Sequence, residues 1–417
     1  MRVAKSTGMS SSRRSAISPT DTLIMSVIQT MHSPVYLDHN ATTPVDPRVV
    51  EAMLPWLREH FGNPSSSHVY GRRTHAAVDA ARERVAAFIG ARPEEIVFTG
   101  CATEANNLAI RGDARALRQR GRHIVTSAVE HPSVAAPCER LRKDGWDVTI
   151  VPVDRYGRVD PAAVAAALRE DTVLVSVMHA NNEVGTVQPV ADIAALTRPR
   201  GILLHADAAQ SAGKIPVSVD ALGVDLLTLA GHKFYATKGV GALYVRAGTP
   251  IDPVLVGAGH ERGLRPGTEN VPALVGLGEA ARLAAQSLDE EAARIRALRD
   301  RLHAALAEAI PGLALNGHPE ARLPNTLNVS FPGVSGRDLL ERAQADVAAS
   351  VGSACHAGDA TVSGVLGAMG VAAEQAAGAV RLSPGRATTE ADIDRAARAL
   401  IAAWRQATTG HVIGASL

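Results

Sequence analysis

From residue 36 onward, short apolar runs rich in β-branched residues alternate with helical stretches rich in alanine and arginine. Within these runs apolar residues follow one another without polar residues at every second position. Strands formed by them would therefore be buried on both faces. Buried strands that alternate with helices are typical of a mostly parallel sheet with helices on both sides. The sequence therefore predicts an α/β fold with a large, mostly parallel seven-stranded sheet. The candidate strands are residues 96–98, 123–126, 148–151, 173–177, 202–204, 226–228 and 241–245.

The chain continues past this pattern into a second unit. A helical pattern spans about residues 271–310, and it is followed by short strand-like runs and a final helix at residues 390–406. We expect a large domain over residues 43–287, and a smaller α+β domain formed by residues 34–42 together with 288–417. Residues 1–33 contain four basic residues and one acid, Asp21. We interpret them as a disordered extension or a start codon assigned too early, with an organellar targeting segment as the alternative.

Composition excludes several classes of protein. The formal net charge is +1 and aromatic residues make up 3%, which argues against a nucleic-acid surface and against an anionic membrane partner. No apolar run approaches the roughly 20 residues that cross a bilayer. Three cysteines are too few and too scattered for a disulfide framework or a zinc site, so we expect no metal and a reducing, cytoplasmic setting.

Two candidate strands end in an acid and an amine. Asp207 follows the run at 202–206, and Lys233 follows the run at 225–230. Ligands of parallel sheets bind beyond the carboxyl ends of the strands, so these two side chains should share one crevice. Pyridoxal phosphate enzymes need a lysine to bond to the cofactor aldehyde and a carboxylate to pair with the pyridine nitrogen. Gln210 lies one turn beyond Asp207 and could contact the phenolic oxygen of that cofactor.

Three further candidate residues follow predicted strands, at the same edge of the sheet as Asp207 and Lys233. Thr103 opens a helix after the strand at 96–98, and a helix start with a hydroxyl is a ready phosphate site. His131 could stack on the cofactor ring and pass protons, although a lone histidine is more often structural. Asn182 could orient an oxygen of the ligand, or could simply form a turn.

Two residues of the smaller unit suggest what is done with the cofactor. Cys355 lies among Ser, Gly and Ala and is followed by His356, a setting suited to a reactive thiolate that takes an atom from a substrate. Arg381 falls in a predicted strand and could clamp a substrate carboxylate, or could be a charge at a strand edge. We interpret Cys101 and Cys138 as structural.

An ordered set of motifs between about residues 36 and 404 resembles the cysteine desulfurases of the NifS/IscS type, which have the class V aminotransferase-like fold. The motifs are YLDHNATTP at 36–44, GNPS at 62–65, ATE at 102–104, EH at 130–131, ANNEVG at 180–185, DAAQ at 207–210, GHK at 231–233, GHERG at 259–263, RPGTEN at 265–270 and SAC at 353–355. Each motif alone is weak, whereas the ordered set is highly specific.

The resemblance implies a pyridoxal phosphate enzyme of fold type I that works as a homodimer. Lys233 would hold the cofactor, His131 would stack on its ring, and Cys355 would form a persulfide. Asp207 would pair with the pyridine nitrogen, and Asn182 and Gln210 would hold the phenolic oxygen. Ala102, Thr103 and His232 would bind the phosphate, Thr268 would reach the phosphate of the partner subunit, and Ala230 and Gly231 would also contact the cofactor. Asn182 and Arg381 would bind the substrate. Three departures stand out: Ala230 replaces a serine, Cys101 replaces a glycine, and Ala236–Thr237 replaces Gly-Pro.

The implied reaction converts L-cysteine to L-alanine, with sulfur left on Cys355 for a sulfur-acceptor protein of unknown identity that serves iron–sulfur clusters or thio-modified tRNA. Residues 349–356 and 265–270 also resemble selenocysteine lyases, so release of selenium from L-selenocysteine is the alternative. Those lyases usually carry an acid after the histidine, where this chain has Pro132. An aminotransferase, which would have no use for Cys355, and a scaffold that has lost its cofactor are further competitors.

Overall fold

The computed structural model describes residues 33–351 and 363–414, with side chains described as far as residue 409. Its largest sheet has seven strands, in the order β2-β8-β7-β6-β5-β3-β4. These strands are β2 (Ile96–Thr99), β3 (His123–Ser127), β4 (Asp147–Val151), β5 (Thr172–Ser176), β6 (Leu203–Asp207), β7 (Leu226–Ala230) and β8 (Gly241–Val245). Each of them contains or overlaps one of the seven runs expected from the sequence.

The sheet is mostly parallel. Strands β4, β3, β5, β6 and β7 pair in parallel, whereas β8 runs antiparallel to both of its neighbours, β7 and β2. Every residue of β2, β3, β5, β7 and β8 is buried, as expected for strands covered on both faces. Only β4, at one edge, exposes side chains to solvent. The predicted fold class is confirmed.

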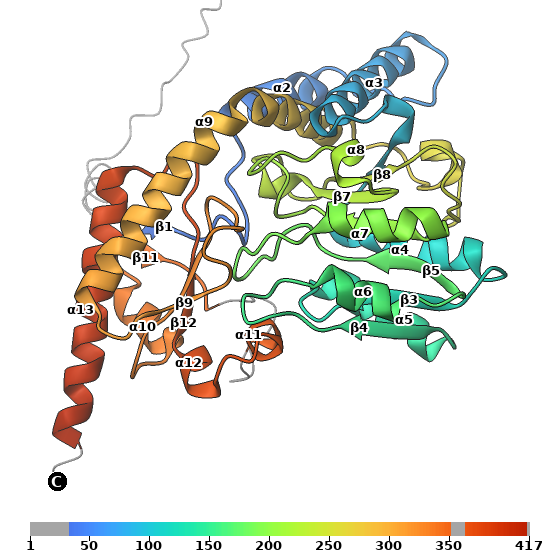
Figure 1. Ribbon diagram of the computed structural model, residues 1–417. Helices are drawn as coiled ribbons and strands as arrows, with labels where there is room; N and C mark the ends of the chain where they lie inside the picture. The colour runs from blue at the N-terminus through green and yellow to red at the C-terminus, as the bar shows by residue number, and fades with distance from the viewer. Residues whose placement is uncertain (1–32, 352–362, 415–417) are drawn as a thin grey trace, which may run out of the picture.

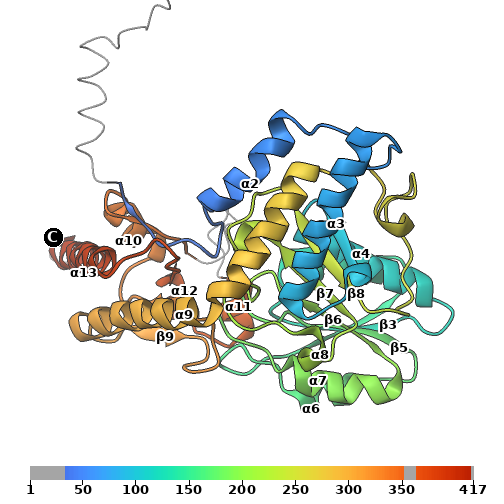
Figure 2. The same cartoon turned by 90° about the horizontal axis from the view of Figure 1, so that it is seen from above.

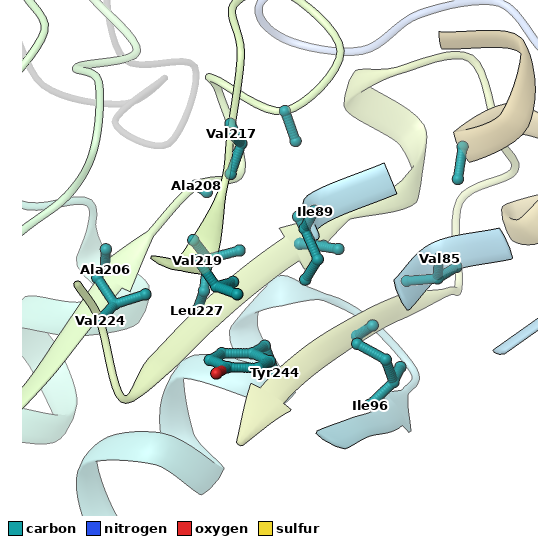
Figure 3. Close-up of a cluster of buried hydrophobic side chains, with 14 of the residues drawn as sticks. Val85, Ile89, Ile96, Ala206, Ala208, Val217, Val219, Val224, Leu227 and Tyr244 are labelled. Atoms are coloured by element: carbon teal, nitrogen blue, oxygen red, sulfur yellow. The ribbon is translucent and has the colours of Figure 1, made fainter. Parts of the chain in front are cut away.

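Helices cover the two faces of the sheet (Figure 1). One face packs against α4 and α5, and the opposite face packs against α2, α3, α6, α7, α8 and the first half of α9. Figure 3 shows part of the hydrophobic core on this opposite face, where Ile89 of α3 lies near Leu227 of β7 and Tyr244 of β8. The helices of this unit are α2 (Pro47–Arg58), α3 (Val69–Ile89), α4 (Ala102–Leu117), α5 (Pro132–Lys143), α6 (Pro161–Ala167), α7 (Val190–Thr197) and α8 (Val219–Leu222).

The long helix α9 (Val271–Ala309) joins two hydrophobic cores. Its first half packs with α2 and α3, and its second half packs against α13 in a separate core (Figures 1 and 2). The domain boundary expected at residue 287 falls inside this unbroken helix. The boundary stays a prediction. The remaining elements are β1 (Val35–Tyr36), β9 (Ala314–Asn316), β10 (Leu327–Ser330), α10 (Gly336–Ala343), β11 (Val347–Ala348), α11 (Gly364–Ala368), α12 (Ala373–Ala377), β12 (Ala379–Leu382) and α13 (Glu390–Gly414).

These remaining elements form a small α+β unit. Strands β12, β10 and β9 make an antiparallel sheet, and β1 pairs in parallel with β11. Residues just after β1 therefore lie beside the small unit, as the isolated bridge between Asp38 and Ser383 shows. They also reach the end of the large sheet, because the backbone N–H of Thr43 donates to the backbone oxygen of His232, just after β7, at 3.0 Å. No helix in the described part of the chain combines the length and apolar character that crossing a membrane requires.

Candidate functional site

A cavity of about 260 Å³ opens at the carboxyl ends of the parallel strands. It is lined by the residues that follow β3, β5, β6 and β7, by the start of α4, and by residues from the small unit. Ten of the expected site residues line it: Ala102, Thr103, His131, Asn182, Asp207, Gln210, Ala230, His232, Lys233 and Arg381. The structure thus brings together side chains that are far apart in the sequence.

Three expected site residues are not among the lining residues. Gly231 lies beside the cavity, where an added Cβ would meet Val240 and Leu277 at 2.9 and 3.0 Å. Thr268 is exposed to solvent and does not line the cavity of its own chain. Cys355 lies outside the described residues.

Asp207 is the last residue of β6, and it is 5% exposed. Its Oδ1 accepts a hydrogen bond from the backbone N–H of Ala209 at 2.9 Å, and its Oδ2 accepts one from Asn106 Nδ2 at 2.8 Å. Two N–H donors stabilise a buried carboxylate, and each oxygen keeps lone pairs for a further donor. The strand end therefore offers an oriented acid to a ligand in the cavity.

His131 is fixed by its role as the N-cap of α5. Its Nδ1 accepts from the backbone N–H of Ser133 at 3.1 Å and lies 2.7 Å from Ser133 Oγ. Because Nδ1 accepts the backbone N–H, a neutral ring carries its hydrogen on Nε2. Burial lowers the pKa of His131, and nearby Lys233 lowers it further while Asp207 opposes this.

Asn106 connects His131 to Asp207. Its buried Nδ2 donates both to Ser133 Oγ and to Asp207 Oδ2, each at 2.8 Å. This residue was not expected from the sequence, although it lies in α4, the helix that begins at Ala102. Its two acceptors, Ser133 and Asp207, belong to other elements of the fold. The position of Asn106 in its own helix was therefore the only signal that the sequence offered.

Lys233 follows β7 in a tight turn. Its Nζ donates to the backbone oxygens of Asn40 and Ala41 at 2.6 and 2.8 Å. The turn continues through Tyr235, whose φ of 72° lies in the left-handed region and costs about 1–2 kcal/mol for a residue with a Cβ. Thr43 Oγ1 holds the turn, since it accepts from the backbone N–H of Tyr235 at 3.0 Å. The segment after β1 thus fixes the direction of the lysine.

The start of α4 and His232 form one side of the cavity. Cys101 precedes the helix in an extended conformation with no side-chain cap, so the first N–H groups of α4 are not capped by a side chain. Gly241 permits this helix to start against β8, because a Cβ there would lie 2.8 Å from the backbone of Cys101. Burial, together with three nearby lysines, lowers the pKa of His232 to about 4, so its ring is neutral. An uncapped helix N-terminus favours an anion such as phosphate.

Arg381 enters the cavity from β12 of the small unit and is 2% exposed. Nη1 donates to the backbone oxygen of Asn182 at 3.0 Å, and Nη2 contacts Asp38 Oδ1 at 2.7 Å. Nε is buried and has no partner in the described part of the chain. Nε therefore remains for an anionic ligand, together with the second hydrogens of Nη1 and Nη2.

Glu130 is a further lining residue that the sequence analysis left without a role. Its Oε1 accepts from Ser127 Oγ at 2.6 Å and from the backbone N–H of Met178 at 2.9 Å. Its Oε2 is buried without a partner among the described residues. Burial raises the pKa of Glu130 to about 8, with a smaller contribution from Asp207, so the acid is protonated at neutral pH.

The residues present fit pyridoxal phosphate. An amine, an oriented carboxylate and an uncapped helix N-terminus meet in one cavity, and these groups match the aldehyde, the pyridine nitrogen and the phosphate of that cofactor. Residues 33–351 and 363–414 contain no cluster of three His, Cys, Asp or Glu side chains arranged to hold a metal ion.

Comparison with known proteins gives a consistent result. The aminotransferase class-V family model matches residues 35–396. A cysteine desulfurase IscS of Anaeromyxobacter dehalogenans is 49% identical over 371 residues, which cover 88% of this chain and 92% of that protein. A solved NifS-like protein is 40% identical with a TM-score of 0.84 and covers 88% of this chain and 98% of its own. A second structure, SspA in complex with cysteine, is 36% identical with a TM-score of 0.76, over 84% and 98% of the two chains. The resemblance to the NifS/IscS type is confirmed.

Proposed function

The chain belongs to the aminotransferase class-V family and is a cysteine desulfurase, and on that premise we propose how its own residues carry out the reaction. The substrate is L-cysteine, the products are L-alanine and a persulfide on Cys355, and pyridoxal phosphate occupies the cavity. The observation that carries this proposal is the meeting of Lys233, Asp207 and His131, from three strand ends, in one cavity.

Several of the lining residues would hold the cofactor. Asp207 would keep the pyridine nitrogen protonated, and His131 would lie against the ring. The uncapped N–H groups of α4 with Thr103 and His232 would hold the phosphate, and Asn182 and Gln210 would hold the phenolic oxygen. When bound, pyridoxal phosphate supplies an aldehyde that bonds to amines and a protonated ring that withdraws electrons from the substrate.

The protein residues then act on L-cysteine. Arg381 Nε, a buried donor with no partner in the described part of the chain, would bind the substrate carboxylate. Lys233, whose direction is set by the Asn40 and Ala41 oxygens, would move a proton at the substrate α-carbon.

Cys355 would take the sulfur as a thiolate. Its sulfur bonds to the substrate sulfur, the substrate Cβ–S bond breaks with its electron pair passing to carbon, and protonation of that carbon gives alanine. Cys138 cannot replace it, because burial raises the pKa of the Cys138 thiol to about 12 and the side chain is 2% exposed. The persulfide would pass to a sulfur-acceptor protein in the cytoplasm.

A homodimer completes this proposal. Phe61 stacks on Tyr70, and both side chains remain exposed, as do Leu57 and Val69 nearby in the chain. Val256, which is 82% exposed, lies in the segment before α9. Arg265 of the same segment forms an ion pair with Glu104 at the start of α4, at 2.8 Å. Exposed apolar side chains of this size favour contact with a second copy. Thr268, exposed in the same segment, would then reach the phosphate in the partner's cavity.

The experiment is a product assay on the purified protein with L-cysteine. We expect alanine and a cyanide-labile persulfide that mass spectrometry places on Cys355. Cys355→Ser should lose both, whereas Cys138→Ala should keep both. A persulfide that persists in Cys355→Ser would contradict the assignment of this residue. Turnover of L-selenocysteine, measured in parallel, tests the alternative substrate, which the relatives do not favour.

A further inference from the structure

Lys214 is a partly buried lysine in the turn that follows β6. Its Nζ donates to Gln210 Oε1 at 2.7 Å and to Asn40 Oδ1 at 3.0 Å. It does not line the large cavity, although it shares with Lys233 a much smaller one of about 20 Å³. Lys214 is therefore placed to act on the site through its neighbours rather than on a ligand directly.

We infer that Lys214 is a positioning residue of the cofactor site, which orients the Gln210 amide so that Nε2 is kept for an oxygen in the cavity. This inference rests on the proposed function, because it concerns how the phenolic oxygen of pyridoxal phosphate is held.

The orientation of the amide follows from the donors around it. Lys214 makes both of its contacts as a donor, to Gln210 Oε1 and to Asn40 Oδ1, so the amide oxygen of Gln210 faces the lysine. Nε2 is then on the other side, where it donates one hydrogen to the backbone oxygen of Asn40 at 2.9 Å. Its second hydrogen remains for a ligand, because Gln210 lines the cavity. Rotating the amide by a half-turn would place its NH₂ group against the donating lysine. It would also place its oxygen against the backbone oxygen of Asn40, so that two acceptors would face each other.

Asn40 contacts Lys214 and Lys233 through different atoms. The backbone oxygen of Asn40 accepts from both Gln210 Nε2 and Lys233 Nζ, at 2.9 and 2.6 Å. Its side-chain oxygen accepts from Lys214 at 3.0 Å and from Asn325 at 2.9 Å. One buried asparagine thus fixes the amide and the reactive amine in the same network.

The contacts of Lys214 do not require its charge. Burial lowers the pKa of Lys214 well below the ordinary value, and Lys233 and Arg381 lower it further. A neutral amine still carries two hydrogens, and Lys214 makes two donor contacts. The same two contacts form in either protonation state.

The test compares two cofactors on the apoenzyme. Pyridoxal 5′-phosphate and its 3-deoxy analogue differ only in the phenolic oxygen that Gln210 would contact. We expect Lys214→Met to bind pyridoxal phosphate about tenfold more weakly than the unmodified chain, which corresponds to losing one well-placed hydrogen bond. Affinity for the 3-deoxy analogue should not change. The matched control is Lys143→Met, which makes the same change at an exposed helix end and should leave both affinities unchanged.

The outcomes separate the two proposals. An equal loss for both cofactors, or no loss for either, would overturn the positioning role of Lys214. Failure of the unmodified chain to bind pyridoxal phosphate would instead overturn the proposed function. If Lys214→Met does not fold, Lys214→Gln keeps one N–H donor for the Gln210 oxygen. That variant should show a smaller loss, confined to pyridoxal phosphate, and a loss of equal size with the analogue would refute the inference.

Discussion

Replacing Glu130 by glutamine should stabilise the protein at alkaline pH. Burial raises the pKa of Glu130 from 4.5 to about 8, and the protonated acid is matched in shape by the amide. A raised acid pKa contributes stability that is fully present below pH 4.5 and is lost as pH rises through 8. The difference of about 3.5 pH units, at about 1.4 kcal/mol each, amounts to about 5 kcal/mol. Glutamine does not titrate and loses none of it.

The assay is urea unfolding of the unmodified chain and of Glu130→Gln between pH 5 and pH 9. The two should be nearly equal at the acid end, and the variant should gain about 1.4 kcal/mol for each pH unit up to 8. Oε1 keeps both of its donors in the variant, since an amide oxygen can accept from Ser127 and Met178. Glu170→Gln, at an exposed position, is the matched control and should parallel the unmodified chain. Parallel curves for Glu130→Gln would refute the assignment of a buried, protonated acid.

Three further predictions concern other buried polar groups. Asp113 has both carboxyl oxygens buried without partners in the described part of the chain, and burial raises its pKa well above the usual range. Asp113→Asn should therefore gain stability over the unmodified chain as pH rises from 5 to 7 in urea unfolding; a pH-independent difference would contradict this. Arg381→Lys loses the Nε donor and should raise the KM for L-cysteine roughly 10–100-fold with cofactor affinity unchanged; an unchanged KM would remove Arg381 from substrate binding. Asn106→Leu takes the side-chain donor from Asp207 and should weaken pyridoxal phosphate binding about tenfold in equilibrium dialysis, and unaltered binding would show that this link is not needed.

The sequence predicted the features of this protein that depend on residues close to one another in the chain. The seven strands could be found because a buried strand is an apolar run, and Asp207 and Lys233 could be placed because each lies at or just beyond the end of such a run. The ten lining residues that were expected came from strand ends, helix starts and the family resemblance.

Residues whose role depends on distant contacts could not be found in this way. Asn40 lies in a motif that was quoted without a role, because its partners Lys233 and Asn325 are 193 and 285 residues away. Lys214 lies in a turn with no motif around it that points to a role, and only its contacts with Asn40 and Gln210 show what it does. The antiparallel direction of β8 was also not evident, since an apolar run is the same in either direction.

The proposal that Lys233 holds the cofactor can be tested against a second lysine, Lys214, which lines the same small cavity. Borohydride treatment of the protein loaded with pyridoxal phosphate fixes the cofactor carbon to the amine that holds it, and mass spectrometry then locates it. We predict a phosphopyridoxyl group on Lys233 alone. Its appearance on Lys214, or on surface lysines with Lys233 unmodified, would contradict the account.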